Sequence, residues 1–591
     1  MSAGHGSALL YSILHFAGYD LSLDDLKQFR QLDSKTPGHP EYGVTPGVDA
    51  TTGPLGQGIA MAVGMAMAEA NLESRYNTEG NKVIDFNTYV LCGDGDLMEG
   101  VSYEAASLAG TLKLNKLIVL YDSNKICLDG ETSLTFTDNV SMRFISLGWN
   151  VITVSDGENF EAINKAIEEA KNSADRPTLI EINTTIGKHS ALEGTNAVHG
   201  SPLSKEDISA IKEKLGLRDI PFTLSQNILD DFRYFINKRC HGLSDDFEKK
   251  LNSLSDDVRE EIEYLMSGDK SIPITEFIYD PPADKCESPR DTSGKILNAL
   301  ALNNPNIMGG SADLFASNKT YIKDGGNFSS SNYLGKNIYF GVREHAMGAI
   351  LNGLALCNLR TFGSCYLAFS DYLKPSIRNC AMMNLPVTYI FTHDSVLVGK
   401  DGATHQPVEQ LAMLRSTPNL SVYRPSDYKE LIGSWNEILK NAKPSALILP
   451  RGHVEVKEFT NPAGIEYGGY IISEVKKSLD VILVTCGSEV DFALELKEEL
   501  LKNYIEARVV SMPNVGNFLK QDKEYQNEVL PKGYKKIVIE FSNDPTWYRL
   551  LESNDEFIGV NTYGKSASEE DVLKELELDL HSLVIRIKNN L

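Results

Sequence analysis

Two polar turns follow apolar segments early in the sequence, and their residue types could bind a metal ion. Gly93-Asp94-Gly95 comes directly after the apolar residues 89–92, and Asp122-Ser123-Asn124 comes shortly after the apolar residues 117–120. The apolar runs predict short buried strands, and residues 99–112 between them predict a helix. Because the carboxyl ends of parallel strands meet at one edge of a sheet, we expect the two turns to lie side by side.

The side chains in these turns offer hard oxygen ligands. We expect the Asp94 carboxylate, the Asn124 side-chain carbonyl and the backbone carbonyl of Ile126 to bind Mg²⁺, with Ca²⁺ as an alternative. Phosphate oxygens and water would complete the octahedron, and Gly93 and Gly95 let the backbone approach a diphosphate closely. A Gly-Asp-Gly tripeptide alone is more often only a turn. The second turn at this spacing favours the metal site.

Length and charge limit the class of protein. The 591 residues are too many for one hydrophobic core and predict three or four domains. The net charge of -24 argues against binding to nucleic acids or anionic membranes, since phosphate backbones require clustered cations. Small phosphorylated substrates stay open, because they need only a few local Arg and His residues.

Cysteine usage and the first residues predict a cytoplasmic protein. The eight cysteines form no Cys-x-x-Cys pair, as expected for free thiols in a reducing compartment. The sequence starts without the basic and long apolar regions of a signal peptide, and no apolar run is long enough to span a membrane.

Helix and strand patterns alternate in three successive blocks, which predicts an α/β protein of three doubly wound domains with mainly parallel sheets. The expected boundaries are 1–270, 271–286 as a linker, 287–456 and 457–591. Residues 201–270 are polar and predict solvated helices. The other expected elements are a helix entered through 52–58 and running to about Tyr76, and strands at 151–154, 178–182, 480–484, 507–510 and 536–539.

Short motifs rich in Gly and His occur along nearly the whole chain. They are Ala3-Gly4-His5-Gly6, Thr36 to Glu41, Thr52 to Gly58, Val198-His199-Gly200, Gly309 to Leu314, Gly341 to Met347, Thr392 to Ser395 and Asp401 to Pro407. In this order, and together with the two turns, they resemble the transketolase family. The resemblance implies a diphosphate-binding first domain, a pyrimidine-binding second domain and a C-terminal α/β domain.

The resemblance also implies the reaction. Transketolases use thiamine diphosphate and Mg²⁺ to move a two-carbon ketol unit reversibly from a ketose phosphate, such as xylulose 5-phosphate, to an aldose phosphate, such as ribose 5-phosphate. The step belongs to the pentose phosphate pathway, and the family forms homodimers with active sites at the subunit interface. The alternatives are a related ketol transferase, such as dihydroxyacetone synthase, and a low-activity or non-catalytic homologue.

The third alternative arises from the start of the sequence. Family members carry a further segment before the Gly-His-Gly motif, with a histidine that faces the reacting centre, whereas Met1 here stands two residues before Ala3. We expect this chain to bind Mg²⁺ and thiamine diphosphate more weakly than a relative that has the segment.

Glu344 matches the family glutamate that contacts the aminopyrimidine ring and relays a proton. Considered without the resemblance, it could also be a surface glutamate at a helix start. Tyr366, Phe369 and Tyr372 are spaced by three residues on an expected helix or turn, and they match aromatics that surround the pyrimidine. Their spacing alone would favour an ordinary core stripe.

Histidines dominate the remaining site residues. A lone histidine is usually structural, but five of the eleven lie in glycine-rich or proline-flanked loops. The resemblance implies the catalytic residues Glu344, His405, His39, His199 and His5.

The resemblance further implies two sets of binding residues. The cofactor set is His5, Gly53, Pro54, Leu55, Gly93, Asp94, Gly95, Glu99, Asn124, His199, Asp313, Glu344, Tyr366, Phe369 and Tyr372. The substrate set is His39, Arg290, Ser317, His393, Asp401, His405 and Arg451, in which the arginines suit a phosphate.

Overall fold

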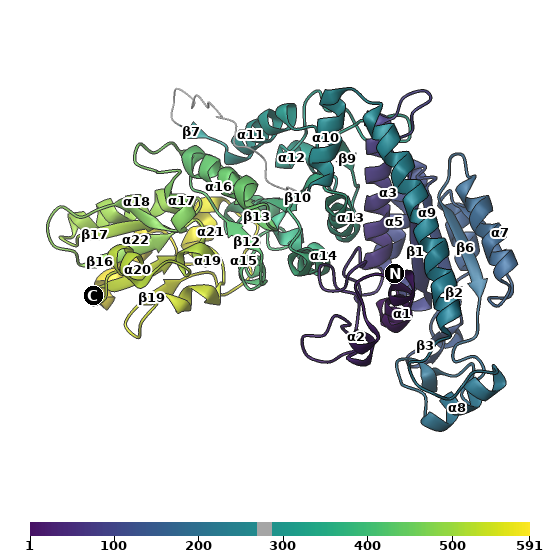
Figure 1. Ribbon diagram of the computed structural model, residues 1–591. Helices are drawn as coiled ribbons and strands as arrows, with labels where there is room; N and C mark the ends of the chain where they lie inside the picture. Colours follow the sequence, from purple (N-terminus) through teal and green to yellow (C-terminus); the bar gives the residue numbers. More distant parts are fainter. Residues whose placement is uncertain (269–285) are drawn as a thin grey trace. The chain divides into compact units, whose positions relative to one another are not determined.

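The structure is a computed structural model that describes residues 1–268 and 286–591 (Figure 1). Of the expected linker 271–286, all but Cys286 lies outside the described residues. The chain divides into two compact units. The first comprises Met1–Asp269, Asn327–Gly335 and His345–Leu359, and the second comprises Lys270–Gly326, Lys336–Glu344 and Arg360–Leu591.

The first unit contains a parallel sheet in the strand order β1-β2-β6-β5. Its strands are β1 (Thr88–Gly93), β2 (Leu117–Ser123), β6 (Thr178–Asn183) and β5 (Asn150–Val154), with a small antiparallel pair of β3 (Ile126–Cys127) and β4 (Gly130–Glu131). The expected strands at 89–92, 117–120, 151–154 and 178–182 are therefore confirmed. Apolar side chains such as Ile118 and Ile180 pack under α7 on one face of the sheet.

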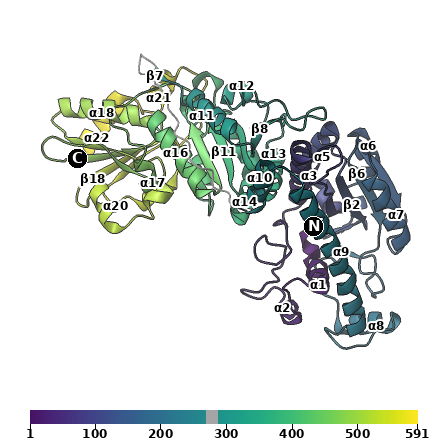
Figure 2. The ribbon, with the colours of Figure 1, turned by 45° about the horizontal axis from the view of Figure 1, so that its top comes forward.

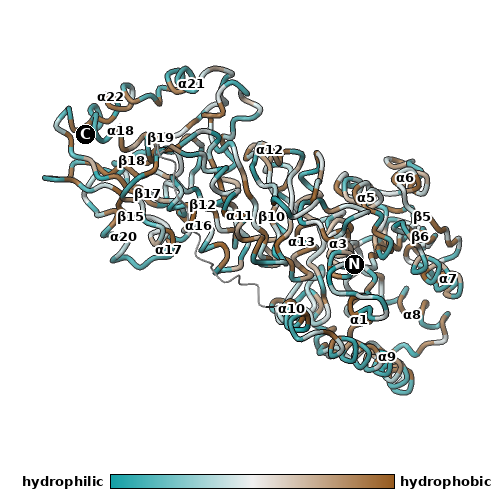
Figure 3. Tube along the Cα trace, turned by 90° about the horizontal axis from the view of Figure 1, so that it is seen from above, coloured by the Kyte–Doolittle hydropathy of each residue, from teal (hydrophilic) through white to brown (hydrophobic). Residues whose placement is uncertain are grey.

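The first unit also contains long and short helices, several of which are labelled in Figure 1. They are α1 (Ser7–Ala17), α2 (Leu23–Lys27), α3 (Gln57–Tyr76), α4 (Asp94–Met98), α5 (Gly100–Leu112), α6 (Val140–Ser146), α7 (Phe160–Lys171), α8 (Lys205–Lys214), α9 (Gln226–Asn252), α10 (Asp256–Met266) and α13 (Glu344–Leu356), with short 3-10 turns at η1 (Gly4–Gly6), η2 (Thr132–Leu134) and η3 (Asn196–Val198). The polar helices expected in 201–270 are α8 to α10. Along α9, hydrophilic and hydrophobic residues alternate in Figure 3, and none of its side chains is buried.

Small residues let two helices of the first unit cross closely. A β-carbon on Gly64 in α3 would meet the backbone carbonyl of Ile350 in α13, and one on Gly353 would meet the carbonyl of Met61. The Ala- and Gly-rich sequence of α3 thus serves backbone-to-backbone packing, which explains why it is buried along most of its length.

The second unit contains two larger sheets. One has the order β12-β13-β11-β10-β8-β9 and is parallel throughout. The other has the order β15-β17-β16-β18-β19, in which only the β15–β17 pairing is antiparallel. With the sheet of the first unit, these give the three mainly parallel α/β sheets expected from the sequence.

The bounds in the second unit are as follows. The first of its sheets contains β8 (Ile307–Ser311), β9 (Asn337–Tyr339), β10 (Arg360–Tyr366), β11 (Val387–Thr392), β12 (Ser421–Tyr423) and β13 (Ser445–Leu449). The other contains β15 (Tyr470–Ser473), β16 (Val481–Thr485), β17 (Ala507–Ser511), β18 (Lys535–Ile539) and β19 (Glu556–Ile558), and β7 (Cys286–Glu287) pairs with β14 (Val454–Glu455). The expected strands at 480–484, 507–510 and 536–539 are confirmed as β16, β17 and β18.

Helices lie on both faces of the sheets in this unit (Figure 2). They are α11 (Pro289–Asn303), α12 (Phe315–Asn318), α14 (Ser370–Met383), α15 (Gln410–Arg415), α16 (Tyr428–Asn441), α17 (Gly464–Tyr467), α18 (Glu489–Lys502), α19 (Val515–Phe518), α20 (Lys523–Val529), α21 (Glu569–Glu575) and α22 (Leu580–Asn590), with 3-10 turns η4 (Leu367–Phe369), η5 (Val396–Asp401) and η6 (Pro545–Arg549). On the C-terminal sheet, α18 and α22 belong to one hydrophobic cluster and α19 and α20 to another.

One local expectation near the first turn is corrected. The sequence pattern predicts Asp94 in a turn before the next helix, whereas Asp94 itself begins the short helix α4. The Asp96 side chain accepts a hydrogen bond from the Gly93 backbone N–H at 3.1 Å, which satisfies a donor at the helix start. The helix expected from 99 begins at Gly100 and ends at Leu112.

Two further observations concern the whole described chain. All eight cysteines are free thiols. Within residues 1–268 and 286–591, no helix combines the length and apolar character needed to cross a bilayer.

Candidate active site

The two polar turns of the first sheet meet at its carboxyl edge. In the parallel pairing of β1 with β2, Gly93 lies opposite Asp122, so Asp94 and Asn124 both follow the strands at the same edge. The prediction that the turns lie side by side is therefore confirmed. The Asn124 side-chain oxygen accepts the backbone N–H of Ile126 at 2.9 Å, which fixes the amide within its own turn.

Asp94 is a buried carboxylate held by neutral donors. The Tyr121 hydroxyl donates to Oδ1 at 2.6 Å, and the Lys125 backbone N–H donates to Oδ2 at 3.1 Å. Burial raises the pKa of Asp94, and the hydrogen bond from Tyr121 works against this rise. Burying a carboxylate without a counter-charge costs free energy, and a bound cation would remove that cost, so Asp94 suits a cation site.

The expected metal ligands are one carboxylate, one amide oxygen and one backbone carbonyl. Among the residues that the structure describes, no group of three or more His, Cys, Asp or Glu side chains could hold a metal ion. The expected set of Asp94, Asn124 and Ile126 is not of that kind, and its all-oxygen character fits Mg²⁺ that keeps phosphate and water ligands.

Asp96 organises this edge, although the sequence analysis did not single it out. Its fully buried carboxylate accepts the Gly56 backbone N–H at 2.9 Å, the Ser2 hydroxyl at 2.6 Å and the Gly93 backbone N–H at 3.1 Å. It thus joins three segments that are distant in sequence. The signal was present as the second acid of Gly93-Asp94-Gly95-Asp96, two residues after the first.

The glycine loop before α3 packs against the His39 loop. Gly53 has a φ of 137°, and a β-carbon there would lie 3.3 Å from the His39 ring. A β-carbon on Gly4 would lie 2.8 Å from the Gly53 backbone nitrogen, and one on Gly95 would lie 2.9 Å from a Leu55 methyl group. A side chain at Gly4 would clash with the backbone, and the positive φ of Gly53 disfavours a side chain there, so the expected loop residues lie close to one another beside the β1 turn.

Three of the expected histidines gather in the first unit. The rings of His5 and His199 lie 5.2 Å apart between centroids. Burial lowers the pKa of His5, and the nearby His199 and His39 lower it further, so the ring is held neutral. The Nδ1 atom of His199 is buried without a hydrogen-bond partner. Such an orphaned polar atom beside the glycine loop fits a polar ligand.

The aromatic residues of the second unit form a stack with two histidines. The Tyr366 ring lies 3.8 Å from His393 and 5.9 Å from Phe369, and Phe369 lies 5.3 Å from His405. Phe369 also lies 6.3 Å from Tyr372, which is 64% exposed. The expectation that the three aromatics share one helix or turn is wrong. They occupy the end of β10, η4 and α14, because the chain turns between a strand and a helix at this point.

The expected phosphate residues cluster beside this stack. Arg290 donates to the backbone carbonyls of Ser317 and Arg451, both at 2.8 Å, and the Ser317 and Tyr366 hydroxyls are 2.7 Å apart. The Nε atom of Arg290 is buried without a hydrogen-bond partner, which fits an anionic ligand.

His393 is the most perturbed histidine of this cluster. Burial lowers its pKa to about 3, and the positive charges of Arg290 and Arg451 contribute to the shift. Thr392 donates its hydroxyl proton to Asn318 at 2.7 Å and lies 2.9 Å from Nδ1 of His393. The threonine oxygen therefore accepts the Nδ1 proton, and Nε2 of the neutral ring is left as an acceptor.

The remaining expected residues lie at a helix start and at exposed positions. Glu344 is the first residue of α13. Burial raises the pKa of Cys365 near the end of β10, and the negative charge of Glu344 raises it further. Glu99, Asp313 and Asp401 are exposed. Their assignments to cofactor and substrate stay predictions.

Family models match nearly the whole chain. The transketolase thiamine diphosphate binding domain matches residues 1–269, the transketolase pyrimidine binding domain matches 288–457, and the transketolase-like TK C-terminal domain matches 468–579.

Curated proteins and solved structures agree with these models. The chain is 46% identical over 606 residues to the transketolases of Bacillus subtilis (strain 168) and Geobacillus stearothermophilus, with 100% of this chain and 90% of each relative covered. The structure of transketolase from Leishmania mexicana superposes with a TM-score of 0.93 at 40% identity, covering 99% of this chain and 88% of that one. Transketolase from Pichia stipitis in complex with sedoheptulose 7-phosphate gives a TM-score of 0.94 at 38% identity, covering 100% and 88%.

Proposed function

Because this chain belongs to the transketolase family, we propose that it transfers a two-carbon ketol unit from a ketose phosphate to an aldose phosphate. The natural candidates are xylulose 5-phosphate as donor and ribose 5-phosphate as acceptor, in the pentose phosphate pathway, and the enzyme class is EC 2.2.1.1. The cluster of Arg290, Ser317, Tyr366 and His393 carries the proposal, since it combines an orphaned arginine nitrogen with neutral polar groups in one place.

The residues of the first unit suit a bound magnesium diphosphate. Asp94, Asn124 and the Ile126 carbonyl would hold Mg²⁺, and the loop with Gly53 would let the backbone reach the diphosphate. When bound, thiamine diphosphate supplies an electron sink for the carbon–carbon bond that is broken. His5 and His199 would donate to, or accept from, groups at this edge, since burial lowers the pKa of His5 and Nδ1 of His199 is buried without a hydrogen-bond partner.

The residues of the second unit would hold the proton and the sugar phosphate. Glu344 would carry a proton at the aminopyrimidine nitrogen, and Tyr366, Phe369 and Tyr372 would offer flat apolar faces to the ring. Arg290 would pair with the phosphate. His393 keeps Nε2 as an acceptor while it is neutral, so it would donate to a phosphate only after the anion has favoured its protonation.

Several finer assignments belong to this proposal. We propose a homodimer in which both copies contribute to each site, Mg²⁺ as the metal, and a cytoplasmic location. The domain boundaries 1–270, 287–456 and 457–591 are part of the same proposal. Light scattering in saturating cofactor tests the dimer, and a monomer under these conditions would contradict it.

The deciding experiment measures ketol transfer from xylulose 5-phosphate to ribose 5-phosphate with and without thiamine diphosphate and Mg²⁺. We expect turnover that needs both ligands and that is lost in Glu344→Ala. Cofactor binding without turnover in the unmodified chain would reject the proposal and favour the non-catalytic homologue.

A second measurement separates the nearest enzymatic alternative. Dihydroxyacetone synthase uses formaldehyde as acceptor, which has no phosphate for Arg451 to bind. Arg451→Ala should therefore weaken transfer to ribose 5-phosphate in a transketolase. A chain that prefers formaldehyde and is unaffected by this change would be the alternative enzyme.

A further inference from the structure

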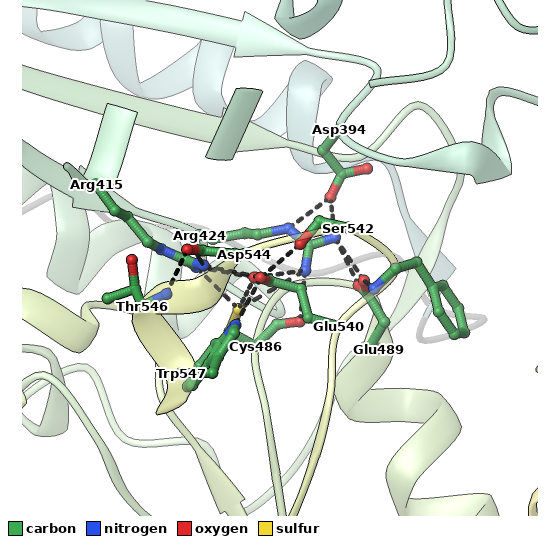
Figure 4. Close-up of polar contacts among 11 residues, drawn as sticks. Asp394, Arg415, Arg424, Cys486, Glu489, Glu540, Ser542, Asp544, Thr546 and Trp547 are labelled. Carbon is green, nitrogen blue, oxygen red and sulfur yellow. Dashed lines mark hydrogen bonds and ion pairs between the residues drawn. The ribbon is translucent and has the colours of Figure 1, made fainter. Parts of the chain in front are cut away.

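A cluster of buried charges joins the two large sheets of the second unit (Figure 4). It contains two guanidinium groups, on Arg415 and Arg424, whose side chains are 4% and 0% exposed. Their acidic partners are Asp394, Glu489, Glu540 and Asp544.

The cluster occupies the carboxyl edge of the C-terminal sheet. Ligands of doubly wound proteins usually bind at this edge. Here Cys486 follows β16 and Glu540 follows β18, and Arg424 from the neighbouring sheet reaches between them. Gly487 has a φ of 64°, and a β-carbon there would lie 2.9 Å from the Arg424 side chain. The edge is therefore filled by protein side chains.

Arg424 is held firmly by the C-terminal sheet. Its Nη2 atom donates to Glu489 at 2.9 Å, and its Nη1 atom donates to the Cys486 carbonyl at 3.2 Å and lies 3.6 Å from Glu540. A planar guanidinium with several fixed acceptors has little freedom to move.

Arg424 also binds the loop that carries His393. Both Nε and Nη2 donate to the same oxygen of Asp394, at 3.0 and 2.7 Å. Asp394 directly follows His393, whose φ of 62° is unfavourable for a residue with a β-carbon. Such a conformation persists only when its surroundings fix it, and the Asp394–Arg424 contact fixes the residue next to it.

We propose that Arg424 is a positioning residue that acts through Asp394 to fix the His393 imidazole for the phosphate end of the substrate. The C-terminal sheet thereby contributes to substrate affinity without contacting the substrate. This inference rests on the proposed function, because that proposal assigns His393 to the sugar phosphate.

The test compares two donors with the same unphosphorylated acceptor, glycolaldehyde. In Asp394→Ala, Arg424 keeps Glu489 and Glu540 as partners, so no buried cation is left alone. We expect the KM for xylulose 5-phosphate to rise about tenfold, the size expected for one lost charge-assisted hydrogen bond. The kcat should stay within about twofold, and the KM for unphosphorylated xylulose should not change. Asp394→Asn keeps one acceptor oxygen and should raise the KM for xylulose 5-phosphate only about threefold.

A matched control removes a similar ion pair from the same cluster. Asp544 pairs with Arg415 at 2.7 Å, and the Arg415 guanidinium keeps Glu540 as a partner after Asp544→Ala. This variant should be destabilised to a similar degree but keep both KM values. An equal rise in KM for both donors, or the same rise in the control, would show that the contact is only structural and would overturn the inference.

A binding measurement separates this inference from the proposed function. Calorimetry with ribose 5-phosphate and with ribose needs no turnover, and Asp394→Ala should weaken only the former, again about tenfold. If Asp394→Ala fails to fold, Asp394→Asn carries the same test with an expected threefold effect on the phosphorylated ligand. An unchanged affinity for ribose 5-phosphate in the folded variant would reject the positioning role even in an active enzyme.

Discussion

Two sheets of this protein present the same kind of edge and use it in opposite ways. At the carboxyl edge of the first sheet, Asp94 accepts hydrogen bonds from a tyrosine hydroxyl and a backbone amide, both of which are neutral. At the carboxyl edge of the C-terminal sheet, Glu540 accepts two guanidinium hydrogen bonds from Arg415, at 2.8 and 2.9 Å.

The two edges differ in the charge of the groups that donate hydrogen bonds to the carboxylate. Burial works to raise the pKa of both carboxyls, and at Asp94 the neutral donors leave it raised. At Glu540 the charge of Arg415 outweighs burial and lowers the pKa to about 2. At the C-terminal sheet, ion pairs between Glu540 and Arg415 stabilise the contact between two sheets. At the first sheet, the donors to Asp94 carry no positive charge, so a cation can still bind there.

The largest expected effect lies at the arginine-filled edge. Glu540→Ala removes one of the two acidic partners of Arg415, which keeps Asp544, and leaves the buried Trp547 indole N–H and Ser542 hydroxyl without their acceptor. We expect the free energy of unfolding to fall by about 3–5 kcal/mol, as for other broken buried ion pairs. Denaturant titration with tryptophan fluorescence measures the change.

A surface pair provides the contrast for this variant. Glu575→Ala removes the exposed partner of Lys565 and should leave the unfolding midpoint unchanged. A Glu540→Ala protein as stable as the unmodified chain would mean that the filled edge contributes nothing to cohesion.

The next largest effect lies at the other edge. Asp94→Ala removes the only carboxylate of the expected metal set, and we expect Mg²⁺-dependent affinity for thiamine diphosphate to fall at least about 100-fold. Calorimetry with both ligands measures it. Asp129→Ala, which changes an exposed acid in the loop between β3 and β4, serves as the control. Retained affinity in Asp94→Ala would place the metal elsewhere.

A smaller effect is expected at Asp96. Asp96→Asn replaces one acceptor oxygen with an NH₂ group that faces the N–H of Gly56 or Gly93, so one of the loop contacts must be lost. We expect about tenfold weaker cofactor binding, the usual size for a residue behind the ligands. The same calorimetric titration tests this, and an unaffected affinity would limit Asp96 to a role in folding.

The smallest effect concerns pH. The folded pKa of His393 is about 3, below the usual value of 6.5, so the unfolded chain binds a proton that the folded chain does not between these pH values. His393 therefore lowers stability as the pH falls from about 6.5 towards 3. His393→Asn should unfold with a shallower pH dependence in this window. Chemical denaturation gives the free energy of unfolding at pH 7 and at pH 5. If this free energy changes equally between the two pH values in the unmodified chain and in His393→Asn, the ring is not held neutral.

Local patterns in the sequence were sufficient for the strands and for the first edge. The apolar runs before Asp94 and Asp122 are recognisable as buried strands, and parallel pairing then requires both turns to lie at one edge. The motifs also led to the cluster of Arg290, Tyr366 and His393, but through family resemblance rather than through any physical signal in their spacing. The strand position of Tyr366 was missed, because aromatics at intervals of three suit a helix equally well.

The sequence by itself determined which segments become strands and helices and where the oxygen-rich turns emerge, because these depend on neighbouring residues. Only the tertiary structure decided which charges are paired. Asp394, Arg424 and Glu489 are separated by 30 and 65 residues, and nothing in the segment around any one of them indicates the others. The sequence does not show whether an acid will lie beside a neutral hydroxyl or beside a guanidinium. The difference between a binding edge and a filled one arises from the partner that folding brings to the acid.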